Sequence, residues 1–126
     1  MKQLISLIFL SFLFINCGQE QGNNTITTVE LKVLLSKEKI QLVDVRTPKE
    51  IEQGSIKTAL FVNYFDEDFA IKLTSILDKN KPVYLYCRSG NRSGKAVKKM
   101  EAAGFTKAHN MTGGWSTWSA EVESKK

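Results

Sequence analysis

Hydrophobic and polar positions follow two alternating periods along the chain. Short runs rich in β-branched and aromatic residues are typical of strands buried on both faces, and they are separated by stretches whose apolar residues recur every three or four positions, as in amphipathic helices. The predicted strands cover residues 40–45, 59–63, 82–86 and 108–111. Because strands and helices alternate, we expect an α/β domain with a parallel sheet and helices on both faces.

The helix starts carry capping signals. Thr27 with Glu30, and Thr47 with Glu50, fit the capping box, and Pro48 takes the first position of the second helix. The predicted inward faces are Leu31, Leu34 and Leu35 in the first helix, Phe69, Leu73, Ile76 and Leu77 in a helix opened by Asp66, and Ala96, Val97, Met100 and Ala103 in a helix over residues 93–103. Lys95, Lys98 and Lys99 are predicted on the solvent side, and Trp115 and Trp118 are predicted to pack from a final helix.

The N-terminal segment is predicted to be an export signal and not part of the folded domain. Lys2 precedes an apolar run at residues 4–15, whose twelve residues would span about 18 Å as a helix, well short of a hydrocarbon core of about 30 Å. The run ends at Cys17, as in the bacterial lipoprotein signal that it resembles. The alternative is an ordinary signal peptide in which Cys17 is incidental.

These features predict four segments: a signal peptide at residues 1–16, a lipid-attachment cysteine with a flexible tether at 17–25, a folded domain at 26–122, and a charged tail at 123–126. The expected location is the periplasmic side of a bacterial membrane, to which the chain is attached through lipid on Cys17.

Composition narrows the class of protein. Eight Gly, two Pro and two Cys in 126 residues exclude collagen-like, disordered and disulfide-scaffold classes. The net charge of +5 is spread as single lysines, which suits small anionic substrates or anionic headgroups but not nucleic acid. If Cys17 carries lipid, the domain keeps one thiol, Cys87, which is either a reactive group or a small buried hydrophobe.

Cys87 directly follows the predicted strand 82–86, at the carboxyl end where ligands gather in parallel sheets. The residues that follow, before the next predicted helix, are Arg88, Ser89, Gly90, Asn91, Arg92 and Ser93. Gly90 and Asn91 tolerate left-handed backbone, so the loop can turn its N–H groups toward the sulfur. These groups, the helix N-terminus and two arginines favour the thiolate, with an expected pKa of about 7 or below.

The spacing of Cys87 and Arg92 distinguishes two kinds of anion site. Cysteine-dependent phosphatases separate the two residues by five positions around a tetrahedral phosphate, whereas four residues separate them here. A smaller loop suits one added sulfur atom, that is, a persulfide on Cys87.

The chain resembles single-domain rhodaneses over about residues 26–120. The resemblance is carried by Glu30-Leu31, Asp44-Val45-Arg46 with Pro48 and Glu50, Gly54-Ser55-Ile56, the loop from Cys87 to Ser93, Gly104-Phe105 and Gly113-Gly114-Trp115. It implies a five-stranded, mainly parallel sheet flanked by helices, and a sulfurtransferase that moves a sulfane sulfur from thiosulfate or a related donor to cyanide or a thiol through a Cys87 persulfide. It also implies that the N–H groups of residues 88–93 stabilise the sulfur, that Arg88 and Arg92 attract the donor, and that no metal or organic cofactor takes part.

Two departures from the family pattern are visible. Ser55 stands where the family usually has His, and Lys57-Thr58-Ala59 lacks its common Pro-Gly. Asp44 is expected to be structural, near the site and paired with Arg46, and Glu50 to be a helix cap. His109 is expected to be incidental, on a short edge-like strand.

Two other functions stay open at this point. Rhodanese-like domains also serve as non-catalytic binding or regulatory modules, although these commonly lack the loop cysteine. A cysteine-dependent phosphatase or arsenate reductase is the other alternative, disfavoured by the shorter loop. The expected partners are a small anionic sulfur donor, a thiol or cyanide acceptor, and a reducing protein, because a lone exported thiolate has no internal resolving cysteine. The chain is expected to act as a monomer.

Overall fold

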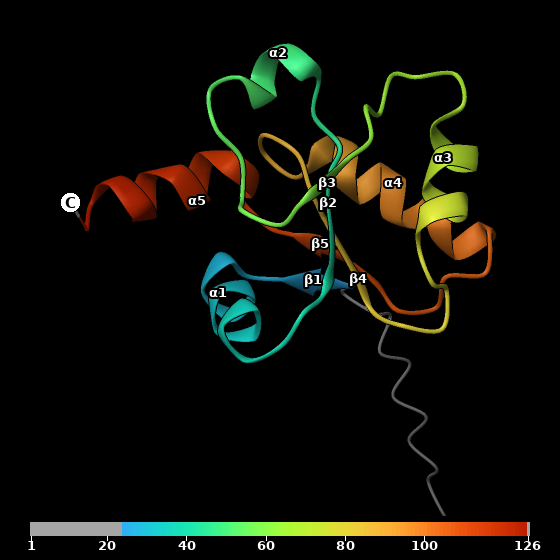
Figure 1. Ribbon diagram of the computed structural model, residues 1–126, viewed down its shortest axis with the longest axis horizontal. Coiled ribbons are helices and arrows are strands. Elements are labelled where there is room, and N and C mark those ends of the chain that lie inside the picture. Colours follow the sequence, from blue (N-terminus) through green and yellow to red (C-terminus); the bar gives the residue numbers. More distant parts are fainter. Residues whose placement is uncertain (1–23, 126) are drawn as a thin grey trace, which may run out of the picture.

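The computed structural model describes residues 24–125 (Figure 1), so the predicted signal peptide and Cys17 lie outside the described residues. The strands are β1 (Thr25–Ile26), β2 (Gln41–Asp44), β3 (Leu60–Phe61), β4 (Val83–Tyr86) and β5 (Ala108–Met111). The helices are α1 (Thr28–Lys37), α2 (Pro48–Ile51), α3 (Phe69–Ile76), α4 (Asn91–Ala102) and α5 (Gly114–Glu123). Within this range, none of the helices combines the length and the hydropathy needed to cross a bilayer.

The strands form one sheet in the order β1-β5-β4-β2-β3, and every pairing is parallel. The predicted α/β architecture is therefore confirmed. Strand β1 was not predicted, because Thr25 and Ile26 are too short a run to show a period. It pairs with β5, starts one residue before the expected domain start, and makes β5 an inner strand where an edge-like strand was expected.

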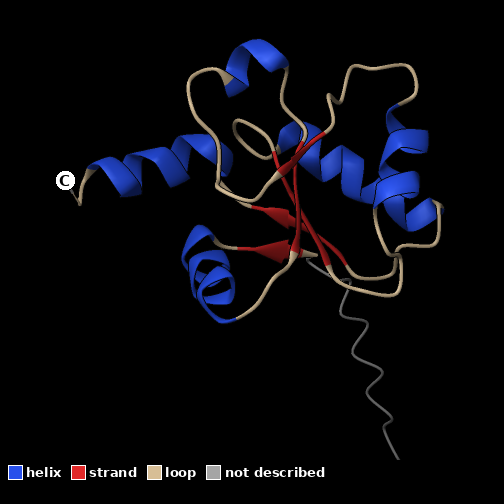
Figure 2. Cartoon of the chain, in the orientation of Figure 1, coloured by secondary structure: helices blue, strands red, loops and turns tan. Residues whose placement is uncertain are grey.

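Two hydrophobic clusters cover the two faces of the sheet, as the alternation along the strands requires. On one face, Val83 and Leu85 pack with buried residues of α3 and α4. On the other face, Tyr84 and Tyr86 pack with Leu31 of α1 and with both tryptophans of α5. The helices in Figure 1 lie accordingly, with α1 and α5 on one side of the sheet and α3 and α4 on the other. Figure 2 shows the strands passing between them.

The capping box predicted for α2 is complete, whereas α1 shows only the Thr27 half of its predicted box. The Thr27 hydroxyl accepts a hydrogen bond from Glu30 N at 3.1 Å at the start of α1. At the start of α2, Thr47 and Glu50 make the reciprocal capping box. The predicted packing roles of Trp115 and Trp118 agree with their place in the second cluster.

Three details of the helices were predicted wrongly. Helix α3 begins at Phe69 rather than near Asp66, and Ile76 is 50% exposed because the end of this short helix turns that side away from the sheet. Ala103 is exposed, since α4 ends at Ala102 and the chain turns away. Helix α4 begins at Asn91, two residues earlier than expected, which shortens the irregular part of the cysteine loop.

Candidate active site

Cys87 lies one residue beyond β4, at the carboxyl edge of the sheet, and is 1% exposed. It continues the alternation of Val83 and Leu85 toward the face covered by α3 and α4. Its sulfur nevertheless lies against polar groups: Gly90 N donates to Sγ at 3.1 Å, and the buried Ser93 hydroxyl lies 3.2 Å from Sγ. The loop therefore encloses the sulfur with hydrogen-bond donors.

The loop curls through Gly90, whose φ of +105° is left-handed backbone that favours glycine. Asn91 also tolerates left-handed backbone, but it is the first residue of α4 and has no positive φ. One glycine is sufficient because the helix begins immediately after it. The N-terminal end of α4 is thereby brought close to the sulfur.

These contacts set the direction of the cysteine pKa. Burial by itself raises the pKa of the Cys87 thiol, but hydrogen bonds from the Ser93 hydroxyl and from the N–H groups of Ser93, Gly90 and Ser89 outweigh it, so the pKa lies below its ordinary value. The direction agrees with the sequence-based prediction. The cause is mainly hydrogen bonding, whereas the prediction also relied on the charges of the two arginines.

The first turn of helix α5 hydrogen-bonds the first two residues of the loop. Trp115 N donates to the Cys87 carbonyl at 2.8 Å, and Ser116 N donates to the Arg88 carbonyl at 3.0 Å. These are N–H groups of the first turn, which have no acceptor within their own helix. Gly114 allows the approach: a Cβ there would lie 2.5 Å from the Cys87 carbonyl oxygen.

Arg92 connects the loop to α2. Its guanidinium donates to both carboxylate oxygens of Glu50, at 2.8 and 2.6 Å. The hydrogen bond with Arg92 is the main reason that the pKa of Glu50 falls to about 2. Arg92 thus ties the loop to the fold, and its charge, which was expected to attract the donor, is balanced by a carboxylate.

The Asp44–Arg46 pair supports the same edge of the sheet and is fully buried. Arg46 Nη2 lies 2.7 Å from Asp44 Oδ2 and also donates to the Gly54 carbonyl at 2.7 Å. The guanidinium carbon lies 4.7 Å from the centre of the Trp115 ring. The pair joins β2, the segment after α2, and α5, which is the structural role expected for Asp44.

Arg88 is exposed, and it has no ion pair among the described residues. It borders a cavity of about 310 Å³ beside the loop. The other residues that line this cavity are Arg46, Glu50, Gln53, Trp115, Ser116 and Ser119. Arg88 is therefore the loop cation that is free to meet an anion from solvent.

Asn110 of β5 is a site residue that the sequence analysis missed. Its Nδ2 donates to the Gly90 carbonyl at 3.0 Å, and its Oδ1 accepts from the Ser93 hydroxyl at 2.6 Å. The Ser93 hydroxyl itself was also overlooked, since only the backbone of the loop was considered. A polar side chain inside the short predicted strand 108–111 was the signal that could have indicated Asn110.

His109 points away from this site. It is stacked on Tyr84, with ring centres 5.2 Å apart, on the face of the sheet opposite Cys87. Burial lowers its pKa. It is not placed to act as a base for the thiol, in agreement with the expectation that it is incidental.

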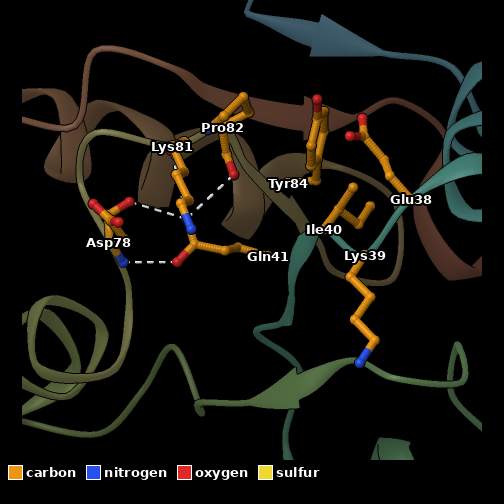
Figure 3. A pocket seen from close by; sticks show the side chains of 8 residues that line it. All are labelled: Glu38, Lys39, Ile40, Gln41, Asp78, Lys81, Pro82 and Tyr84. Atoms are coloured by element: carbon orange, nitrogen blue, oxygen red, sulfur yellow. Dashed lines mark hydrogen bonds between the residues drawn. The ribbon is translucent and has the colours of Figure 1, made fainter.

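A second cavity, of about 500 Å³, lies at the other edge of the sheet, where the strands begin (Figure 3). Gln41 spans one side of it: its side chain donates to the Asp78 carbonyl at 2.9 Å and accepts from Asp78 N at 2.7 Å. These bonds order the loop before β4. In residues 24–125, no group of three or more His, Cys, Asp or Glu side chains is placed to hold a metal ion.

The fold and this site define an α/β protein with a buried, hydrogen-bonded cysteine at the carboxyl end of a central parallel strand. The rhodanese-like domain family matches residues 27–121. A sulfurtransferase of Allochromatium vinosum is 38% identical over 85 residues, covering 68% of this chain and 77% of that protein. The uncharacterized protein YqhL of Bacillus subtilis is 30% identical over 129 residues, covering 99% and 98% of the two chains.

The crystal structure of a rhodanese-like domain protein from Staphylococcus aureus superposes with a TM-score of 0.67 at 39% identity, covering 75% of this chain and 89% of that one. The chain belongs to the rhodanese family, as the motif resemblance implied. Its homologues support the sulfurtransferase kind of activity.

Proposed function

We propose that the protein is a rhodanese-type sulfurtransferase that carries a sulfane sulfur as a persulfide on Cys87. The observation that carries this proposal is the set of hydrogen-bond donors around Sγ, with Gly90 N at 3.1 Å and the Ser93 hydroxyl at 3.2 Å. Such donors stabilise a thiolate, which is the nucleophilic form of cysteine. A purely structural cysteine would need none of them.

The reaction has two displacement steps and no net redox change in the protein. The Cys87 thiolate attacks the outer sulfur of thiosulfate, the sulfur–sulfur bond of the donor breaks, and sulfite leaves with the electron pair. Cys87 then bears a persulfide whose charge lies on the outer sulfur. A thiolate or cyanide attacks that outer sulfur, and the Cys87 thiolate leaves.

Each part of the site has a role in this scheme. The donors around Sγ stabilise Cys87 as nucleophile and as leaving group. Arg88 attracts the anionic donor, because it is exposed and has no acidic partner among the described residues. Arg92 holds the loop in shape through Glu50.

We also propose that the chain is exported, is anchored by lipid on Cys17 at the periplasmic side of a membrane, acts as a monomer, and is kept reduced by a partner protein. The apolar run that ends at Cys17 supports the first two statements. The need for a reductant follows because Cys87 is the free cysteine of the described domain.

Intact-mass spectrometry after incubation with thiosulfate tests the proposal. We expect the chain to gain one sulfur atom, and we expect Cys87→Ser to gain none. The matched control is Cys17→Ser, which removes the other cysteine and should still take up sulfur. The absence of an adduct from any sulfane donor would favour a binding module, and turnover of a phosphomonoester would favour a phosphatase.

A further inference from the structure

The Ser93 hydroxyl lies between two acceptors. Its oxygen is 3.2 Å from Cys87 Sγ and 2.6 Å from Asn110 Oδ1. A serine hydroxyl has one proton to donate. It can therefore donate to the sulfur or to the amide oxygen, but not fully to both.

The orientation of the Asn110 amide is set by a separate contact. Its Nδ2 donates to the Gly90 carbonyl, which also accepts from Gly94 N at 3.0 Å. If the amide rotated by half a turn, Oδ1 would face that carbonyl oxygen, and two acceptors would be in contact. The amide oxygen is thus held toward Ser93, as a permanent acceptor.

The two ionisation states of Cys87 need different positions of the Ser93 proton. In the thiol state, the S–H group donates to Ser93 and the hydroxyl donates to Asn110. On ionisation the thiol proton leaves to solvent, and the hydroxyl turns from Asn110 to the negative sulfur. Asn110 Oδ1 then loses its hydrogen bond from Ser93.

We propose that Asn110 is a positioning residue that competes with Cys87 for the Ser93 proton and thereby opposes formation of the thiolate. The inference deepens the proposed function and rests on it for its role in turnover. In the persulfide the charge lies on the outer sulfur, and Sγ no longer needs the hydroxyl, which returns to Asn110. Asn110 therefore disfavours the free thiolate relative to the persulfide, and so favours sulfur loading.

Other charged groups face the loop from the neighbouring elements. Arg92 of α4 is paired with Glu50 of α2, and Asp44 at the end of β2 is paired with Arg46. Arg88 stands on the loop itself. The substitutions below leave all of them in place, so in the variants that add no charge a change in the pKa of Cys87 reports on the hydroxyl.

The test measures the pKa of Cys87 from the pH dependence of its alkylation rate, in a chain whose other cysteine is replaced by Cys17→Ser. Asn110→Ala releases the hydroxyl to the sulfur, and the pKa should fall by about half a unit to one unit, the effect of one hydrogen bond. Asn110→Asp keeps the acceptor and adds a negative charge, so the pKa should rise. A loop that is merely loosened moves its N–H groups away from Sγ, and the pKa would then rise in both variants.

The decisive control is Ser93→Ala, which removes the proton for which the two groups compete. In that background Asn110→Ala should leave the pKa of Cys87 unchanged, although Ser93→Ala alone raises it. If Asn110→Ala shifts the pKa of Cys87 equally with Ser93 present and with Ser93→Ala, the proposal is overturned. If thermal melts show that Asn110→Ala does not fold, Asn110→Ser replaces it.

The measurement needs no sulfur donor, so it is independent of the proposed reaction. Should the pKa shifts appear without any uptake of sulfur from thiosulfate, the proposed transfer fails while the competition for the proton stands.

Discussion

At the scale of single residues, Thr58 is the clearest conflict between side chain and backbone. Its φ is +79°, and no other non-glycine residue among those described has a positive φ. Ala59 N donates to the Ile56 carbonyl across it at 3.1 Å, so Thr58 occupies the third position of a turn that requires left-handed backbone. The Pro-Gly that is common at this point of the family suits such a turn, and a β-branched residue does not.

Thr58→Gly should therefore stabilise the protein. The relief of backbone strain exceeds the entropy lost by glycine, and we expect a gain of about 0.5 to 1 kcal/mol in the free energy of unfolding. Thermal melts would show a rise of a few degrees. Thr106→Gly is the matched control, since Thr106 is also exposed in a turn but has no positive φ, and it should be neutral or slightly destabilising.

Replacing Arg88 should weaken the attraction of the anionic donor without changing the reactivity of Cys87. Arg88→Ala removes the exposed loop cation but none of the hydrogen bonds to Sγ. We expect KM for thiosulfate to rise about three- to tenfold while the Cys87 pKa changes little, because one exposed charge contributes about 1 kcal/mol. Steady-state rates at low and high salt measure this. Lys98→Ala, an exposed cation on α4, should leave KM unchanged, and an equal rise in both variants would show that only net charge matters.

At the scale of elements, the contact of α5 with the cysteine loop makes Gly114 critical. Gly114→Ala would place a Cβ 2.5 Å from the Cys87 carbonyl oxygen and 2.6 Å from that of Arg88, at a φ of +57°. We expect a loss of about 2 kcal/mol or more in stability together with slower alkylation of Cys87, because the loop must move.

The control is Gly104→Ala. This glycine also has a positive φ, of +96°, but its Cβ would come no nearer than 3.8 Å to the Lys79 side chain. It should lose about 1 kcal/mol from backbone strain alone and keep the alkylation rate of the parent. Equal effects of both substitutions on Cys87 would show that α5 does not position the loop.

The ion pair between α2 and α4 makes the free energy of unfolding depend on pH in the acid range. The pKa of Glu50 in the folded protein is about 2, against 4.5 for an ordinary glutamate, mainly through its hydrogen bond with Arg92. A lowered folded-state pKa means that the stabilisation is complete above about pH 5 and is lost as the pH falls toward 2. Glu50→Gln keeps a side chain suitable for the capping box, yet it should lower the free energy of unfolding at neutral pH by about 1 to 2 kcal/mol.

Denaturant unfolding from pH 7 down to pH 2 measures this difference, which should shrink with falling pH. Glu30→Gln is the matched control, because Glu30 occupies the same position behind the cap of α1 and has no ion pair within the described part of the chain. Its effect should be small at all pH values. If the loss of stability in Glu50→Gln does not change with pH, the lowered pKa of Glu50 is contradicted.

Elements also show how far sequence reasoning reaches. Caps are local, so Thr27 and Thr47 could be recognised from the sequence. The pattern of apolar residues also located β4, β5 and the cysteine loop that follows β4. The contacts that complete the site join distant parts of the chain: Asn110 to Ser93, Glu50 to Arg92, and α5 to Cys87. No local pattern encodes these pairings, so the contact of Asn110 with Ser93 and the role of the Ser93 hydroxyl became visible only with the fold.

At the scale of the whole molecule, the parallel sheet separates the point where the chain enters from the point where the chemistry takes place. Asn24 leads into β1 level with Tyr84, the second residue of β4, and its carbonyl accepts from Asn110 N at 2.6 Å. Cys87 follows β4 at the carboxyl edge of the sheet. Figure 1 shows the described chain entering on the side of the sheet away from the cysteine loop.

If Cys17 carries lipid, we expect the site to lie farther from the membrane than the point where the chain enters the sheet. Eight Cα–Cα steps join Cys17 to Thr25 and can span at most about 29 Å, so the point where the chain enters the sheet stays within that distance of the headgroups. From that level to Cys87 the strand rises by about 10 Å more. The lipid-anchored chain on zwitterionic vesicles, which do not repel thiosulfate, should therefore form the persulfide at the same rate as Cys17→Ser without lipid. A clear slowing on the vesicles would place the loop against the bilayer and contradict this orientation, whereas equal rates would leave the site open to acceptors arriving from solution.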